Sequence, residues 1–157
     1  MRARTSSGLL PSRLRDGRDE VLIAHMGGPL WARREEGAWT VVKGEYEEPE
    51  EPLAAARREF REETGSPAPE GPAIELGEVR QAGGKRVGAW AIEADLDPGT
   101  LRSNTFELEW PPRSGRMQEF PEVDRFEWCE LAPARRRLVK AQAALLDRLL
   151  AELEAQP

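Results

Sequence analysis

The chain is poor in the residues that build histidine and cysteine sites, since it holds one cysteine, Cys129, and one histidine, His25. A lone thiol forms no internal disulfide and no cysteine-rich zinc cluster. A lone imidazole excludes a histidine metal cage and a histidine-based triad. We therefore expect Cys129 to be a small core residue, His25 to be a packed strand residue, and the protein to be cytoplasmic.

Long apolar runs and excess positive charge are also missing. No run approaches the roughly 20 residues that cross a bilayer, so we expect no membrane partner. Lysine is scarce, with three lysines beside twenty arginines, and the net charge is −6. A nonspecific nucleic-acid binder needs a basic face, so we expect no nucleic-acid partner. A phosphate-bearing substrate is still possible because a bound metal ion supplies local positive charge.

The pattern of apolar residues predicts several strands and two helices in one domain spanning residues 1–157. Pro52 and Gly65 stand where a helix begins and ends, and apolar residues at helical spacing from Leu138 to Leu149 predict a C-terminal helix. Strands are predicted at residues 9–10, 21–24, 39–42, 74–79, 87–92, 106–110 and 123–131. Strands on either side of a helix indicate a layered α/β domain rather than a simple βαβ series.

The predicted first helix carries Glu59, Glu62 and Glu63 on one face, beside its apolar stripe. Three crowded carboxylates repel one another, and a purely structural helix gains nothing from that arrangement. A hard divalent cation such as Mg²⁺ removes the repulsion because it prefers carboxylate oxygens and usually brings substrate phosphates with it. Arg58, four residues before Glu62, can orient a carboxylate through a charge-assisted hydrogen bond. The alternative is an ordinary solvated helix of mixed charge.

The wider spacing favours the metal interpretation, because the stretch from Gly44 to Ser66 resembles the Nudix box. That pattern is a glycine, a glutamate six residues on, and then Arg-Glu-hydrophobic-x-Glu-Glu-x-Gly. The matching residues are Gly44, Glu50, Arg58, Glu59, Phe60, Glu62, Glu63 and Gly65. Ser66 departs from the apolar residue that the family prefers. Of the flanks, Trp39 to Glu45 resembles the strand and Lys-Gly-Glu entry found in many members. The stretch from Ser103 to Trp128 resembles a bacterial branch known mainly as predicted nucleoside triphosphate pyrophosphohydrolases.

The resemblance implies a Nudix-type α/β/α sandwich with a mixed central sheet. It also implies that water attacks a phosphorus and cleaves a phosphoanhydride bond in a nucleoside diphosphate-linked substrate, with a nucleoside triphosphate or dinucleoside polyphosphate favoured. Mg²⁺ or Mn²⁺ would activate the water. The implied metal ligands are Glu59, Glu62, Glu63 and the Gly44 carbonyl, with Glu50 and Arg58 as the supporting pair.

Further site residues are expected outside the box. The family often takes an accessory acid near its last strand, and Glu122 is the first candidate, with Glu119 second. The alternative for either is a solvated loop acid. Cationic partners for the phosphates are also needed, and arginine suits them well. The candidates are Lys43 first, then Lys85, Arg86, Arg113 and Arg116, the last two in a loop that could fold over a polyphosphate or be plain surface.

Two other functions remain open at this stage. One is a Nudix-fold module that binds nucleotides or regulates but no longer turns substrate over. The other is an unrelated α/β domain in which the acidic helix is structural. The intact acids of the box argue against the first, and the upstream Gly44 and Glu50 at matching spacing argue against the second.

Overall fold

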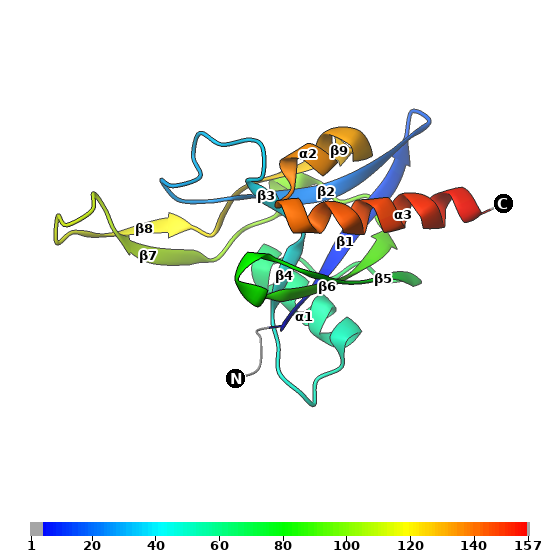
Figure 1. Ribbon diagram of the computed structural model, residues 1–157, viewed down its shortest axis with the longest axis horizontal. Coiled ribbons are helices and arrows are strands. Elements are labelled where there is room, and N and C mark those ends of the chain that lie inside the picture. Colours follow the sequence, from blue (N-terminus) through cyan, green and yellow to red (C-terminus); the bar gives the residue numbers. More distant parts are fainter. Residues whose placement is uncertain (1–4, 157) are drawn as a thin grey trace.

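The computed structural model describes residues 5–156, so residues 1–4 and 157 of the predicted domain lie outside it. Its centre is a seven-stranded sheet in the order β3-β2-β1-β6-β5, with β4 on β1 and β9 on β2 (Figure 1). The β1–β6 pair is parallel and the other pairs are antiparallel, so the sheet is mixed. The strands are β1 (Thr5–Arg15), β2 (Arg18–Met26), β3 (Trp39–Thr40), β4 (Val42–Glu45), β5 (Ala73–Arg80), β6 (Arg86–Glu93) and β9 (Val123–Glu130).

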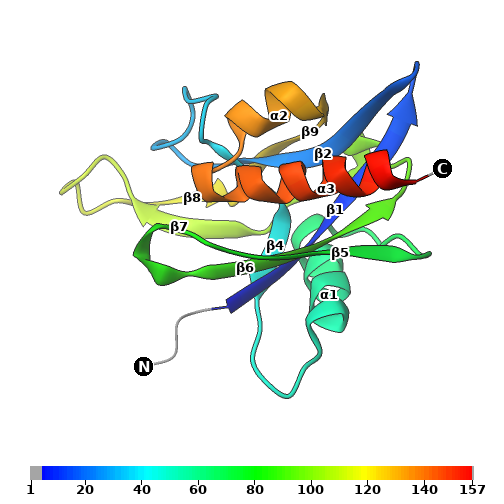
Figure 2. The same ribbon diagram turned by 45° about the vertical axis from the view of Figure 1, so that its right-hand side comes forward.

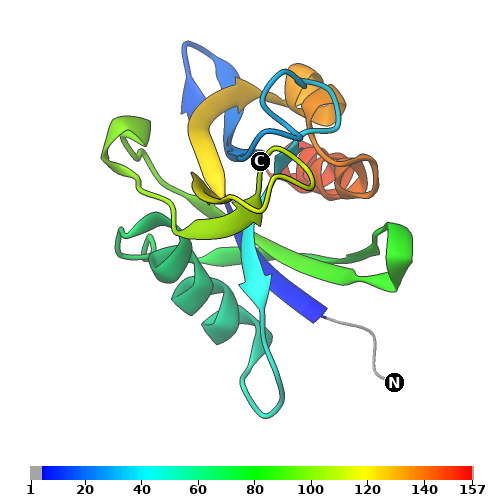
Figure 3. The ribbon, with the colours of Figure 1, turned by 90° about the vertical axis from the view of Figure 1, so that its left-hand side faces the viewer.

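Helices cover both faces of this sheet, as the turned views show (Figures 2 and 3). Helix α1 (Pro52–Thr64) lies on one face, where Phe60 and Ala56 enter a small core. Helices α2 (Leu131–Arg137) and α3 (Ala143–Ala155) lie on the other face, over the larger core. The predicted α/β/α sandwich with a mixed central sheet is confirmed. Within residues 5–156, no helix has the length and apolar character needed to cross a membrane.

Strand β1 is the spine of the sheet. Residues 6–9 of β1 pair with β4, residues 12–15 pair with β2, and residues 5–12 pair with β6. The sequence predicted only residues 9–10 of this strand, because the serines, glycine and proline around them hide its length. Gly8 is required where β1 crosses β4, since a Cβ there would meet the Val42 carbonyl oxygen at 2.6 Å.

Three elements differ from the sequence prediction. Strands β7 (Thr105–Glu109) and β8 (Met117–Pro121) form a separate hairpin, and β8 was not predicted. Helix α2 was also missed. The C-terminal helix begins at Ala143, not Leu138. Leu138 is buried because its extended backbone bridges to Trp39, so it matches the apolar spacing of a helix without belonging to one.

Gln142 links the C-terminal part of the chain to the β3–β4 segment and to the end of β5, and it is fully buried. Its Oε1 accepts a hydrogen bond from the Val41 N–H at 2.9 Å, and its Nε2 donates to Thr40 Oγ1 and Gln81 Oε1 at 3.0 and 2.8 Å. Both hydrogens of the amide are used, so its orientation is determined.

Replacing Gln142 should therefore destabilise the fold. Gln142→Leu leaves the buried Val41 N–H without its partner, and we expect a loss of about 1–3 kcal/mol in the free energy of unfolding. The matched control is Gln118→Leu, whose bond to the Trp110 carbonyl is exposed and which should change stability by less than about 0.5 kcal/mol. Urea unfolding of both variants measures the difference, and equal effects would contradict the assigned role of Gln142.

Candidate active site

Helix α1 presents the box glutamates because its ends are fixed as the sequence predicted. Pro52 occupies the first turn, after Glu51 in extended conformation, and Gly65 ends the helix with a φ of 70°. A residue with a side chain is strained at such a φ. The apolar stripe faces the sheet, so Glu59 beside it is only 6% exposed while Glu62 stays in solvent.

Arg58 holds three carboxylates together. Its Nε and Nη2 donate to the two oxygens of Glu50 at 2.7 and 2.8 Å, which is the bidentate geometry that a guanidinium favours. Its Nη1 donates to Glu59 Oε1 at 2.9 Å and to Glu62 Oε2 at 3.0 Å. The hydrogen bonds to Glu50 raise the pKa of Arg58 and help lower that of Glu50. The loop before the helix is thereby tied to the acidic face, as the prediction of a supporting pair requires.

Gly44 has no side chain, and the Glu59 carboxylate occupies the space where one would lie. A Cβ on Gly44 would overlap the Glu59 carboxylate, so any side chain at this position would displace the acid. Burial raises the pKa of Glu59, and Arg58 partly opposes that shift. A buried carboxylate beside the backbone of a glycine is therefore built into the junction of β4 and α1.

Glu63 and Glu122 meet across the site. Burial first, and then the charge and hydrogen bond of Glu122, raise the pKa of Glu63 from its ordinary value of 4.5 to about 7. Glu122 is the acid that the sequence favoured. Glu119, the second candidate, lies within β8 on the exposed hairpin, and no interaction ties it to Glu63 among the described residues.

Backbone hydrogen bonds fix the position of Glu122, which joins β8 to β9. Its carbonyl accepts from the Gly27 N–H at 2.8 Å, and its N–H donates to the Asn104 carbonyl at 2.8 Å. The Asn104 side chain donates in turn to the Glu62 carbonyl at 3.1 Å. A Cβ on Gly27 would collide with the Pro121 carbonyl, so this approach requires glycine. The base of the β7–β8 hairpin is thus fastened to the end of α1.

A pocket of about 200 Å³ opens beside Glu63 and Glu122. Its apolar lining includes Val123 and Phe126, and its polar lining includes Lys43, Gln81 and Gln142. Burial lowers the pKa of Lys43, and the positive charge of Lys85 adds to this. Because Gln142 donates to Gln81 Oε1, the Gln81 amide nitrogen is left as a donor, with no acceptor among residues 5–156.

The remaining predicted cations lie farther out. Arg86 begins β6, and Arg113 and Arg116 lie at the exposed tip of the β7–β8 hairpin. Each hairpin strand is five residues long, so the tip is roughly 15 Å from the base at about 3.4 Å per residue. The structure therefore does not bring these two arginines to the carboxylates, and their contact with a phosphate stays a prediction.

The acids form two groups rather than one cluster. Arg58 holds Glu59 and Glu62, and Glu63 faces Glu122. Among residues 5–156, no three acidic, histidine or cysteine side chains converge closely enough to form a ready metal cage. The donor chemistry nevertheless suits a hard divalent cation, because the site offers carboxylate oxygens, one of them beside the Gly44 backbone. Such a cation would take the place of the proton that Glu63 retains.

Comparison with known proteins assigns the family. The sequence profile of the NUDIX domain matches residues 12–149. An octanoyltransferase of Myxococcus xanthus is 34% identical over 102 residues, which are 65% of this chain and 25% of that protein. The chain thus spans about a quarter of the length of this curated relative.

Solved structures show the same fold. An Ap4A hydrolase of C. elegans in a binary complex superposes with a TM-score of 0.68 at 21% identity, over 98% of this chain and 100% of that one. The Nudix domain of Shewanella oneidensis NrtR, complexed with ADP ribose, gives 0.63 at 13% identity over 98% and 90%. The Nudix hydrolase RenU of M. smegmatis gives 0.60 at 22% identity over 98% and 87%.

The chain belongs to the Nudix family. Its fold is shared with Nudix hydrolases, a class that acts on nucleoside diphosphate derivatives and generally uses divalent metals.

Removing the charge of Glu63 should change how the metal-free protein responds to pH. Because the folded-state pKa of Glu63 lies above its unfolded value, the folded state binds the proton more tightly. The stabilising effect of that proton is complete below about pH 4.5 and is lost as the pH rises through about 7. With chelator present, we expect Glu63→Gln to gain roughly 1–2 kcal/mol on wild type between pH 4.5 and pH 8.

A control variant at Asp147 should show the opposite dependence of stability on pH. Arg135 lowers the pKa of Asp147 below its ordinary value of 3.8, so Asp147→Asn should lose stability relative to wild type only as the pH rises toward about 4, and should show no further change from about pH 4.5 to pH 8. Thermal unfolding at a series of pH values measures both variants. If the difference between Glu63→Gln and wild type did not change with pH, the account of the Glu63–Glu122 pair would be refuted.

Proposed function

We propose that this domain uses Mg²⁺ or Mn²⁺ to hydrolyse a phosphoanhydride bond in a nucleoside triphosphate or a dinucleoside polyphosphate. Glu59, Glu62 and Glu63 would hold the cation, together with the Gly44 carbonyl. The observation that carries the proposal is the meeting of Glu63 with Glu122 beside a pocket. Like-charged side chains brought together in a cleft are typical of a site that awaits a cation or a proton transfer.

The roles of the chain's own groups follow from their contacts. When bound, the cation supplies positive charge that activates water and neutralises the charge developing on phosphorus. Arg58 orients Glu59 and Glu62 and keeps the loop of Glu50 against the helix. Glu122 accepts the proton of the attacking water, because it is the solvent-exposed partner of the pair. Lys43, at the pocket wall, binds a phosphate oxygen.

The pocket suggests how a nucleotide would be held. Its apolar lining from Val123 and Phe126 suits the face of a base, while its polar side offers the Gln81 amide nitrogen as a hydrogen-bond donor. A base carbonyl oxygen is an acceptor that matches this donor. The similarity of the fold to an Ap4A hydrolase is compatible with a dinucleoside polyphosphate, and ADP ribose bound to another neighbour is a further diphosphate to test.

A substrate panel with metal control tests the proposal. Nucleoside triphosphates, dinucleoside polyphosphates, ADP ribose and other nucleotide sugars are incubated with millimolar Mg²⁺ or Mn²⁺, and the products are identified. We expect turnover of at least one triphosphate or dinucleoside polyphosphate and its loss after chelation, because the carboxylates need a hard cation. Full activity after exhaustive chelation would refute the metal assignment. Tight nucleotide binding without turnover would favour the alternative, a module that has lost catalysis.

A matched pair of variants distinguishes the two candidate accessory acids. Glu122→Gln keeps the shape but cannot accept a proton, so we expect kcat to fall by about 100-fold. Glu119→Gln, on the exposed hairpin, should keep kcat within about twofold of wild type. Turnover at saturating metal and substrate measures both. If the two variants were equally active, the accessory acid would have to lie elsewhere.

The hairpin arginines should matter only for long substrates. Because Arg113 and Arg116 lie far from Glu63, Arg113→Ala and Arg116→Ala should leave KM for a nucleoside triphosphate unchanged. For a dinucleoside polyphosphate, each should raise KM more than it lowers kcat, since a remote phosphate contact acts alike in ground and transition states. We expect less than about 1 kcal/mol for each exposed contact. An unchanged KM across the whole panel would remove these arginines from the site.

A further inference from the structure

A β-bulge lies two residues beyond Glu122. Strand β2 pairs with β9 through His25 and Arg125, but the next pair along is Met26 with Val123. Asp124 is therefore the extra residue of the bulge. Bulges re-aim neighbouring side chains and are frequent beside active sites. Here the bulge decides the direction in which the chain leaves β9 toward Glu122.

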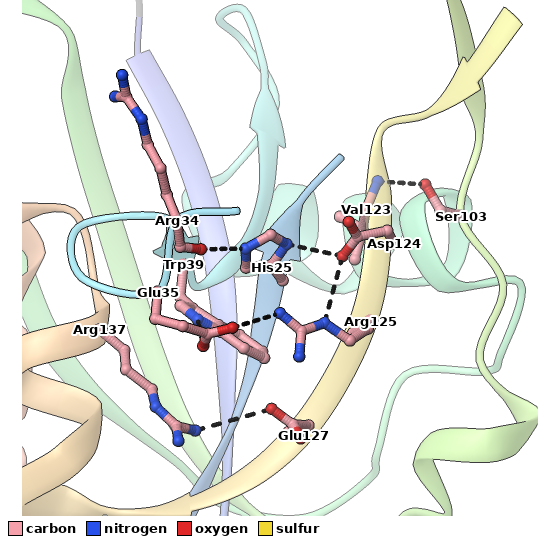
Figure 4. Close-up of polar contacts among 10 residues, drawn as sticks. All are labelled: His25, Arg34, Glu35, Trp39, Ser103, Val123, Asp124, Arg125, Glu127 and Arg137. Carbon is pink, nitrogen blue, oxygen red and sulfur yellow. Dashed lines mark hydrogen bonds and ion pairs between the residues drawn. The ribbon is translucent and has the colours of Figure 1, made fainter. Parts of the chain in front are cut away.

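His25 locks this bulge from inside the protein (Figure 4). Its side chain is fully buried and bonded at both ring nitrogens. Nδ1 lies 2.7 Å from Asp124 Oδ1, and Nε2 lies 2.6 Å from the Arg34 carbonyl oxygen. The Arg34 carbonyl and the Asp124 carboxylate can only accept, so each ring nitrogen must carry a hydrogen to make its bond. The imidazole thus joins the bulge to the loop of residues 27–38.

The same two segments hold Glu122. Gly27, at the start of the loop, donates its N–H to the Glu122 carbonyl at 2.8 Å. Val123, between Glu122 and the bulge, donates its N–H to Ser103 Oγ at 2.8 Å. Any shift of the bulge or of the loop would move the backbone on which Glu122 stands.

Charged groups outside the core hold Asp124 from its other side. Arg125 Nε lies 3.7 Å from Asp124 Oδ1, and its Nη2 donates to Glu35 Oε1 at 2.8 Å. Glu35 also accepts from the Trp39 indole at 3.3 Å, and the Trp39 ring meets the His25 ring edge-on at 5.0 Å between centroids. Farther along β9, Glu127 pairs with Arg137 of α2, with 3.7 Å between Oε2 and Nη1. The carboxylate of Asp124 is therefore held between an imidazole and a guanidinium.

We propose that His25 and Asp124 are positioning residues for Glu122, acting through the bulge that they lock. This inference rests on the proposed role of Glu122 in catalysis. A purely apolar side chain could fill the space of His25. It could not satisfy the Arg34 carbonyl and direct Asp124 at the same time. The bond to Asp124 thus sets the path of the chain into the site, and the bond to Arg34 orients the imidazole that makes it.

Two substitutions of His25 separate its two bonds. In His25→Asn the side-chain amide lies where Nδ1 was and keeps the link to Asp124. In His25→Gln it reaches the place of Nε2 and keeps only the link to Arg34. We expect His25→Gln to lower kcat by about 10-fold with KM within about twofold of wild type, and His25→Asn to restore most of kcat. Asp124→Ala, which removes the same link from the partner nearer the solvent, should match His25→Gln.

A double-mutant cycle with Glu122 decides the matter. In the Glu122→Gln background, Asp124→Ala should lower kcat by less than about twofold more, because its effect is transmitted through Glu122. The control Asp147→Ala removes an exposed partner of Arg135, outside the site, and should leave kcat unchanged. Circular dichroism and the unfolding midpoint check that each variant folds.

The outcomes are distinguishable. If Glu122→Gln is slow but Asp124→Ala keeps wild-type kcat, the positioning inference is overturned and the proposed function stands. If the losses from Asp124→Ala and Glu122→Gln multiply in the double variant, the inference is also overturned, because the two residues act independently. If Glu122→Gln keeps wild-type turnover, the role of Glu122 and the positioning inference fail together.

Discussion

The crowding of carboxylates at the end of α1 is the constraint on which the rest of the site depends. Glu59, Glu62, Glu63 and Glu122 gather where two segments far apart in sequence meet, and like charges at this spacing repel one another. The protein counters the repulsion in two ways. Arg58 shares its guanidinium among the acids of the box, and Glu63 keeps its proton beside Glu122 to a higher pH than an isolated glutamate would. Both arrangements leave carboxylate oxygens that a divalent cation can bind.

The sheet provides the rigidity that this crowding requires. Strand β1 pairs with β4, which carries Lys43 and Gly44, and with β2, which carries His25. The same frame therefore holds the box and the bulge that leads to Glu122. Glycines permit the two closest approaches, Gly44 to the Glu59 carboxylate and Gly27 to the Pro121 carbonyl. The site is built on strands and helix ends, which hold side chains more precisely than free loops do.

Much of the part of the site formed by the Nudix-box residues could be predicted from the sequence, because the contacts that build it are local. Pro52 and Gly65 mark the ends of α1, and the spacing of Glu59, Glu62 and Glu63 places them on one face. The Arg58–Glu50 contact spans eight residues and follows from the same spacing.

The contacts around Glu122 could not be predicted, although Glu122 itself was a candidate, because these contacts join distant segments. His25 and Asp124 are 99 residues apart, and Gln142 and Gln81 are 61 apart, so no periodicity connects them. The prediction of His25 as a packed strand residue is confirmed, but its two hydrogen bonds left no signal in the sequence. Strand β8 was not predicted because its sequence is short and mostly polar. The distance of Arg113 and Arg116 from the carboxylates depends on the length of the hairpin, which the sequence did not show.

Direct binding of Mn²⁺ tests the central claim that these acids exchange a proton for a cation. Calorimetric titration of the metal-free protein near pH 7, in two buffers of different ionisation enthalpy, reports both binding and proton release. We expect wild type to bind Mn²⁺ and release protons, because the pKa of Glu63 is raised to about 7. Glu63→Gln should bind more weakly and release fewer protons. Equal affinity and equal proton release in wild type and Glu63→Gln, or no binding by wild type, would contradict the account.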